Sequence, residues 1–265
     1  MGAAAIVLVL SSALLHAGWN ARTHAGDDRL ATLTVAYLTV AVILSPWLIT
    51  DPPAEVLGFL VLSAIAHSGY IWSLSGAYDR GALSITYPVA RGSAPLLVAV
   101  VGIWFLDQTP SVLTFAGVTT VALGLTLIGG VALGLGERSA LLMALTTGMF
   151  IATYTLLDAK GANETSGFGF FAGSAPIAAA VTMVTSRVGP VRLKAAARQG
   201  ITVGIMATSA YGLILLAYTR ADAANVATLR ATSILFGLAL APGRVTRRIV
   251  VGAVLVVAGS MMVMS

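Results

Sequence analysis

The chain has 265 residues, of which 58% are hydrophobic and only 9% charged, whereas soluble globular domains average roughly 45–50% and about 25%. With a mean hydropathy of +0.94, this composition excludes a soluble enzyme, and the absence of cysteine excludes disulfides, thiolate nucleophiles and cysteine-based metal sites. The net charge of +5 is not gathered into a basic tail or patch, so nucleic acid is not expected as a partner.

Ten apolar runs follow one another along the chain, most of them close to the ~20 residues that cross a bilayer as a helix. The first run has neither a basic start nor a small-residue cleavage site, which indicates a retained helix rather than a signal peptide. The sequence therefore predicts an all-α integral membrane protein with ten transmembrane helices. The runs cover residues 3–19, 30–49, 56–77, 83–106, 112–135, 140–157, 168–185, 201–219, 223–241 and 249–264.

The helices are expected to form two repeats, because a pattern of small, aromatic and basic residues occurs twice, roughly 140 residues apart. Its two copies are Ala77, Tyr78, Arg80, Arg91, Gly92 and Ser93, and Ala217, Tyr218, Arg220, Arg230, Ala231 and Ser233. Likewise, Gly252 and Gly259 repeat the seven-residue spacing of Gly117 and Gly124. Residues 1–136 and 137–265 are each predicted to form a five-helix repeat. Since five is an odd number of spans, the second repeat is expected to be inverted, as in many transporters.

The second repeat is predicted to be shorter in its fourth helix or in the loop that follows. Arg91 precedes Gly117 by 26 positions, but Arg230 precedes Gly252 by only 22. The missing four residues amount to about one helical turn. We expect the gap in the turn-forming segment 241–243.

Basic residues are divided unequally between the two sides of the predicted membrane. The loops after the odd-numbered runs hold eleven lysines and arginines, and those after the even-numbered runs hold only Lys160 and Arg220. By the positive-inside rule the eleven-charge side is cytoplasmic, which places both termini outside.

Arg91 and Arg230 are the two formally charged side chains inside the ten runs, and they hold equivalent places in the two repeats. An arginine at the centre of a bilayer helix costs at least ~2.5–3.5 kcal/mol on insertion scales, and we expect no carboxylate inside any span to offset this. A guanidinium binds a carboxylate or phosphate with two hydrogen bonds, so both arginines are predicted to hold an anionic or zwitterionic ligand. The alternative is that either side chain extends to the headgroups.

Two prolines, Pro88 and Pro95, flank Arg91. Each removes a backbone donor from the helix, so a break or kink is expected around Arg91. Irregular backbone at membrane depth is tolerated where it lines a cavity or is buried in protein. Span 9 has no proline, which makes Arg91 the stronger candidate for contact with a substrate.

Polar and aromatic residues at helical spacing complete the predicted cavity, although simple packing is an alternative for each. His16 could also carry a proton, because imidazole titrates near neutral pH, or it could be a hydrogen-bonded structural residue. The predicted lining consists of Arg91 and Arg230 with His16, Asn20, Tyr70, Tyr87, Tyr154 and Tyr211.

Two segments resemble the EamA family of the drug/metabolite transporter superfamily: His16-Ala17-Gly18-Trp19-Asn20 and the stretch from Tyr87 to Pro95. The resemblance covers the whole chain and implies secondary transport by alternating access, with a cavity between two five-helix halves. It also implies cytoplasmic termini, which opposes the charge count. Many members have a Gly-Glu pair before the last span, where this chain has Ala241-Pro242-Gly243-Arg244.

The expected function is transport, as a permease or exporter, of a small anionic or zwitterionic metabolite by a multi-pass protein of the inner membrane. Alternatives are export of hydrophobic cations, a lipid-handling enzyme, or a membrane subunit that does not transport. No hydrolase motif, metal site or cofactor site is found, so an enzyme is not expected. The expected partners are a small-molecule substrate, the lipid bilayer and, as one option for assembly, a second copy of the chain.

Overall fold

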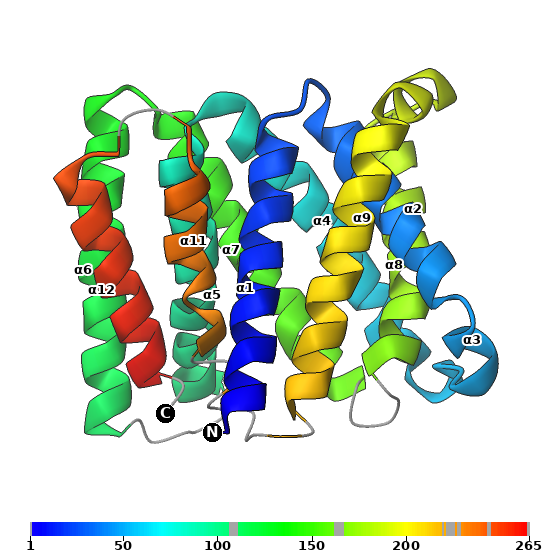
Figure 1. Cartoon of the computed structure of the whole chain (residues 1–265), viewed down its shortest axis with the longest axis horizontal. Helices are drawn as coiled ribbons and strands as arrows, with labels where there is room; N and C mark the ends of the chain where they lie inside the picture. Colours follow the sequence, from blue (N-terminus) through cyan, green and yellow to red (C-terminus); the bar gives the residue numbers. More distant parts are fainter. Residues whose placement is uncertain are drawn as a thin grey trace.

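The computed structural model describes residues 2–105, 111–161, 167–218, 220, 226, 229–242 and 245–263. Within these ranges the chain is helical and contains no strand, and its long helices stand side by side in one bundle (Figure 1). The elements are α1 (Ala3–His24), α2 (Arg29–Leu44), α3 (Trp47–Thr50), η1 (Ala54–Val56), α4 (Leu57–Arg80), α5 (Leu83–Phe105), α6 (Val112–Gly134), α7 (Arg138–Gly161), α8 (Gly167–Thr185), α9 (Pro190–Tyr218), α11 (Ser233–Leu240) and α12 (Arg247–Val263).

Within the described ranges, five helical segments are long and apolar enough to cross a membrane, and α2 is a shorter apolar helix. They are Ala3–His24, Ala54–Arg80, Val112–Gly134, Arg138–Asp158 and Gly167–Thr185. Large apolar side chains such as Leu62, Phe115 and Met149 lie exposed on these segments. An apolar exterior of this extent fits contact with lipid rather than water. The chain is therefore an all-α membrane protein.

Antiparallel helices α6 and α12 pack backbone against backbone at the two pairs of glycines found in the sequence. A Cβ added to Gly124 would lie 2.6 Å from the carbonyl oxygen of Gly252, and one added to Gly259 would lie 2.6 Å from that of Gly117. In lipid no hydrophobic effect drives helices together, so van der Waals contact at small residues stabilises their packing instead. These four glycines are thus structural.

Helix α5 runs without interruption from Leu83 to Phe105. The backbone stays helical at both Pro88 and Pro95, so neither proline ends the helix. The predicted break in α5 is therefore absent. A membrane helix tolerates proline where neighbouring groups form hydrogen bonds with the carbonyl oxygens that have lost their backbone donor. A bend around Arg91 stays a prediction.

The last part of the predicted ninth span is short. Helix α11 has 8 residues and ends at Leu240, directly before Ala241 and Pro242. Leu229 and Arg230 are helical, and a turn at Ala231 and Thr232 separates them from α11. Gly243 and most of 219–228 lie outside the described residues, so the loss of one helical turn in the second repeat stays a prediction.

Asp28 fixes the turn between α1 and α2 and ties it to α9. Its side chain caps α2 by accepting a hydrogen bond from the backbone N–H of Ala31 at 3.0 Å. Arg192 donates two more, from Nε to Oδ2 at 2.7 Å and from a terminal nitrogen to Oδ1 at 2.9 Å. The hydrogen bonds from Arg192 hold the pKa of Asp28 below its ordinary value, against the opposing effect of partial burial.

The first prediction concerns the glycine contacts. We expect Gly124→Ala to lower the free energy of unfolding by about 1–3 kcal/mol, because the added methyl group meets the backbone of α12. SDS-induced unfolding of the purified protein in mixed micelles measures the change. Gly130→Ala is the matched control, since a Cβ there has nothing within 4 Å. Equal stability of the two variants would contradict the close packing of α6 on α12.

The second prediction concerns pH. A folded-state pKa below the ordinary value of 3.8 means that ionised Asp28 contributes stability above that value, and that the contribution is lost as the pH falls through the lowered folded pKa. Thermal unfolding measured across this acidic range should therefore show a drop in the wild type that Asp28→Asn flattens. Asp27→Asn, at an exposed neighbouring position, is the control and should keep the wild-type profile. Parallel profiles for wild type and Asp28→Asn would contradict the assignment.

Candidate functional site

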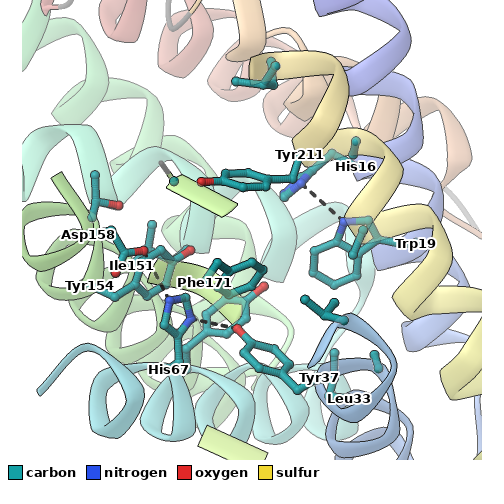
Figure 2. Close-up of a pocket in the computed structure, with 18 of the residues that line it drawn as sticks. His16, Trp19, Leu33, Tyr37, His67, Ile151, Tyr154, Asp158, Phe171 and Tyr211 are labelled. Carbon is teal, nitrogen blue, oxygen red and sulfur yellow. Dashed lines mark hydrogen bonds and ion pairs between the residues drawn. The ribbon is translucent and has the colours of Figure 1, made fainter. Parts of the chain in front are cut away.

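A cavity of about 560 Å³ lies inside the bundle. Its lining comes from helices α1, α2, α4, α5, α7, α8 and α9. Arg230, which precedes α11, also contributes to it. Aromatic rings from several of these helices face one another across it (Figure 2). Six of the eight predicted substrate-binding residues line this one cavity: His16, Tyr70, Arg91, Tyr154, Tyr211 and Arg230.

The other two predicted residues, Asn20 and Tyr87, do not line the cavity. The amide of Asn20 donates to the carbonyl of His16 at 2.8 Å, and its oxygen accepts from the hydroxyl of Tyr78 at 2.7 Å. The ring of Tyr87 is buried and packs against Gly237 of α11. Both side chains hold helices together behind the cavity wall, and helical spacing alone did not separate this role from cavity lining.

Arg91 and Arg230 bring positive charge to the cavity from equivalent places in the two predicted repeats. Both side chains are partly buried rather than exposed at the end of a helix. Within the described part of the chain, Arg91 has no carboxylate partner at ion-pairing distance. A guanidinium in this position can bind an acidic group that enters the cavity with two hydrogen bonds.

His16 is held by its neighbour on α1. The indole N–H of Trp19 donates to Nδ1 of His16 at 3.3 Å, and the two rings meet edge to face with centroids 5.0 Å apart (Figure 2). This hydrogen bond uses the lone pair of Nδ1, so the proton of the neutral ring lies on Nε2. His16 thus lines the cavity while its Nδ1 is hydrogen-bonded within α1 rather than to a neighbouring helix, and its role as a proton carrier stays a prediction.

Asp158 is a carboxylate at the end of a candidate span, and it is not among the residues predicted to line the cavity. It lies within helix α7 and the candidate span Arg138–Asp158, and its side chain lines the cavity. Ser63 of α4 donates a hydrogen bond to Oδ1, and Nε2 of His67 lies 3.3 Å from Oδ2. Asp158 had been placed just outside the sixth apolar run because a charged residue lowers local hydropathy, although helix α7 continues past it.

His67 joins Asp158 to the aromatic wall of the cavity. Its Nδ1 lies 2.8 Å from the hydroxyl of Tyr37 on α2, and its ring stacks on Tyr154 with centroids 4.0 Å apart (Figure 2). The sequence places Ser63, His67 and Tyr70 at helical spacing on one face, and Tyr154 and Asp158 at helical spacing on another. It gave no signal that these two faces meet.

The cavity thus carries both signs of charge. Two arginines can hold an acid, one carboxylate can hold a proton or a cation, and the rings of the tyrosines offer apolar surface with a hydroxyl at the tip. Such a small set of polar groups in a largely aromatic pocket is typical of a binding site for a small molecule. Within the described residues there is no group of three or more His, Cys, Asp or Glu side chains that could hold a metal ion.

No known protein-family profile and no curated protein matches the chain. Eleven chains of solved structures match. One of them, described only as "Crystal structure of protein", aligns over 98% of this chain and 96% of its own length, with a TM-score of 0.56 and 18% sequence identity. At this identity the likeness concerns the fold alone, which extends over nearly the whole of both chains.

The third prediction separates the buried contact of Asn20 from the cavity. We expect Asn20→Ala to lower the free energy of unfolding by about 1–3 kcal/mol, because it leaves the buried hydroxyl of Tyr78 without its acceptor. Tyr78→Phe should lower the free energy of unfolding by less. The double variant should be no less stable than Asn20→Ala, because phenylalanine removes the hydroxyl that Asn20→Ala leaves unsatisfied. SDS-induced unfolding of the three variants measures this. Strictly additive losses would show that the two side chains do not interact.

Proposed function

We propose that the chain is a secondary transporter, multi-pass in the inner membrane, that moves a small anionic or zwitterionic metabolite by alternating access. The observation that carries the proposal is that Arg91 and Arg230 line one cavity inside a bundle with an apolar exterior. The proposal includes ten membrane spans in two inverted repeats, residues 1–136 and 137–265, as in the EamA family of drug/metabolite transporters.

Arg91 and Arg230 each place a guanidinium group at the cavity. Each costs at least ~2.5–3.5 kcal/mol at the centre of a membrane helix, and water in the cavity reduces that cost only while the cavity is open to it. A bound carboxylate or phosphate would replace the lost water with charge-assisted hydrogen bonds. Arg91, which has no carboxylate partner within the described part of the chain, is therefore best explained by an acidic cargo that takes the place of water.

The helix contacts support the inverted repeats. The predicted repeats pair α1 with α7, α2 with α8, α4 with α9, α5 with α11 and α6 with α12. Exchanging each helix for its counterpart turns the contact of α4 with α7 into that of α9 with α1, and the contact of α5 with α7 into that of α11 with α1. Both members of each pair of contacts occur.

The contact between α6 and α12 maps onto itself under the same exchange. Gly117 corresponds to Gly252 and Gly124 to Gly259 in the predicted repeats. Gly117 meets Gly259 and Gly124 meets Gly252, so each glycine pair becomes the other. Such reciprocal contacts are typical of two-fold related elements, which supports an inverted arrangement of the two halves.

A second candidate is export of an organic cation, which Asp158 favours. The sequence had argued against this function because no carboxylate was expected in the membrane. The carboxylate of Asp158 lines the cavity beside Tyr154, and aromatic faces attract cations. The two arginines in the same cavity oppose a purely cationic cargo by repulsion, so the acidic or zwitterionic cargo remains our conclusion.

The fourth prediction tests the role of Arg91. A thermal-shift screen of the purified protein against amino acids, organic acids and phosphorylated metabolites should identify a ligand, because binding to the folded state alone raises its stability. Arg91→Ala is expected to weaken binding of that ligand by about 10- to 100-fold, the range for a hydrogen bond to a charged group. Arg91→Lys should fall between, since a lysine keeps the charge but not the two-pronged geometry.

Arg80→Ala is the matched control, because Arg80 lies at the end of α4, outside the cavity lining, and donates to the carbonyl of Gly76. It should leave ligand affinity unchanged. Flux of the same ligand into liposomes that contain only the purified chain would then separate a transporter from a binding subunit or an enzyme. Unchanged affinity in both Arg91 variants would reject the acidic cargo, and a hit limited to organic cations would favour the second candidate.

A further inference from the structure

The contact of His67 and Asp158 has no part in holding an acidic cargo. Asp158 accepts a hydrogen bond from Ser63 and lies 3.3 Å from Nε2 of His67, whose Nδ1 lies 2.8 Å from the hydroxyl of Tyr37. The side chain of His67 is 5% exposed and that of Asp158 is 32% exposed, and both line the cavity. We propose that His67 and Asp158 form a proton-binding site, and that the proton bound there strengthens the attachment of α4 to α7.

Both protonation states of the pair keep the hydrogen-bonded chain intact. In the state without the extra proton, Nε2–H of His67 donates to the carboxylate of Asp158, and Nδ1 accepts from the hydroxyl of Tyr37. In the state with it, both ring nitrogens of His67 are donors, so Nδ1–H donates to the oxygen of Tyr37. The hydroxyl of Tyr37, which lines the cavity, then turns its own proton toward the cavity. One reorientation therefore lets the site take or release a proton.

The cavity is the route by which the proton enters and leaves. Asp158 is partly exposed there, whereas the ring of His67 is covered by Tyr154 on one face and approached by Phe171 of α8, which does not titrate, with centroids 5.5 Å apart. A proton from water in the cavity therefore reaches the ring through the hydroxyl of Tyr37, a residue of the cavity lining. The hydroxyl passes its own proton to Nδ1 of His67 and takes up one from the water, so Nε2 keeps its hydrogen.

Other ionisable groups face the pair from the helices around the cavity. They are Tyr37 of α2, Tyr70 of α4, Tyr154 of α7, Arg91 of α5, His16 of α1 and, with Tyr211 of α9, Arg230. The positive charges of the arginines favour an ionised carboxylate at Asp158 and disfavour a second positive charge. With the proton bound, the pair carries no net charge, so it adds no further positive charge beside the arginines.

The site joins two elements that belong to different predicted repeats. Ser63 and His67 lie on α4, in residues 1–136, and Asp158 lies on α7, in residues 137–265. An imidazolium paired with a carboxylate is bound more strongly than a neutral ring, because both partners carry charge. Proton binding is therefore expected to hold α4 and α7 together and proton release to loosen them, which, on the function proposed above, would couple cargo movement to protons.

The fifth prediction uses the small number of histidines in the chain, which has 3. Protein with isotope-labelled histidine in nanodiscs should give imidazole resonances for His16, His24 and His67, and His67→Gln assigns the last. The His67 signal should change with pH in the wild type, and in Asp158→Asn this change should move to lower pH, because the negative partner is lost. The His24 signal, from the far end of α1, should keep its wild-type profile.

A second measurement reports on the attachment of α4 to α7. Because the chain has no cysteine, Thr155→Cys introduces a single thiol in the cavity wall one turn before Asp158. We measure the rate of its reaction with a charged, membrane-impermeant thiol reagent and correct it for the fraction of thiolate. The corrected rate should be about tenfold higher at high pH, because the charge-assisted contact between α4 and α7 is lost there. Ser139→Cys, at an exposed position at the start of α7, supplies the thiolate correction.

Adding Asp158→Asn to Thr155→Cys should make the corrected rate fast at every pH. Ser63→Ala, which keeps the charge of Asp158, should raise the rate by less and preserve its pH dependence, and it replaces Asp158→Asn if that variant does not fold. A His67 signal that does not respond to Asp158→Asn, or a corrected rate for Thr155→Cys that does not depend on pH, would overturn the proposal. Neither measurement needs a cargo, so its failure is distinct from failure of the proposed function.

Discussion

The structure depends on keeping two arginines inside a bundle whose outer surface is made for lipid. A guanidinium has no low-energy position in hydrocarbon, so the helices around Arg91 and Arg230 must provide either water or polar partners. They do so by leaving a cavity of about 560 Å³ at the point where these helices meet. The tyrosines that line it suit this boundary, since each presents an apolar ring to the helices and a hydroxyl to the space.

A second feature of the bundle is that several polar side chains make hydrogen bonds between helices as well as within them. Asn20 accepts from Tyr78, Ser68 and Thr182 share a hydrogen bond at 3.0 Å, and Thr147 donates to Ser73 at 3.1 Å. Hydrogen bonds of this kind hold membrane helices together where no hydrophobic drive exists. Apolar contacts alone would allow the same helices to slide, so these pairs fix the register in which the charged residues meet at the cavity.

The sequence predicted those features that depend on one helix at a time. Hydropathy located the long helices, and the repeated seven-residue spacing singled out the glycines at which the structure brings α6 and α12 together. The rarity of arginine in apolar runs pointed to Arg91 and Arg230, which do line one cavity. What it missed depends on contacts between helices: Asn20 and Tyr87 face neighbouring helices, and Asp158 meets Ser63 and His67 across 95 and 91 positions of the chain. No local pattern encodes such a pairing.

The seam between α6 and α12 limits which parts of the molecule can move. At these glycines the carbonyl oxygen of the facing helix and branched side chains such as Val256 and Ile128 lie in close contact, so one helix cannot slip past the other without separating from it. A slip of seven residues, or about 10 Å along the axis, would bring only one glycine of α6 opposite a glycine of α12 and would lose the second contact. The pair therefore serves as a stationary frame, and any rearrangement that opens the cavity must pivot the remaining helices against it.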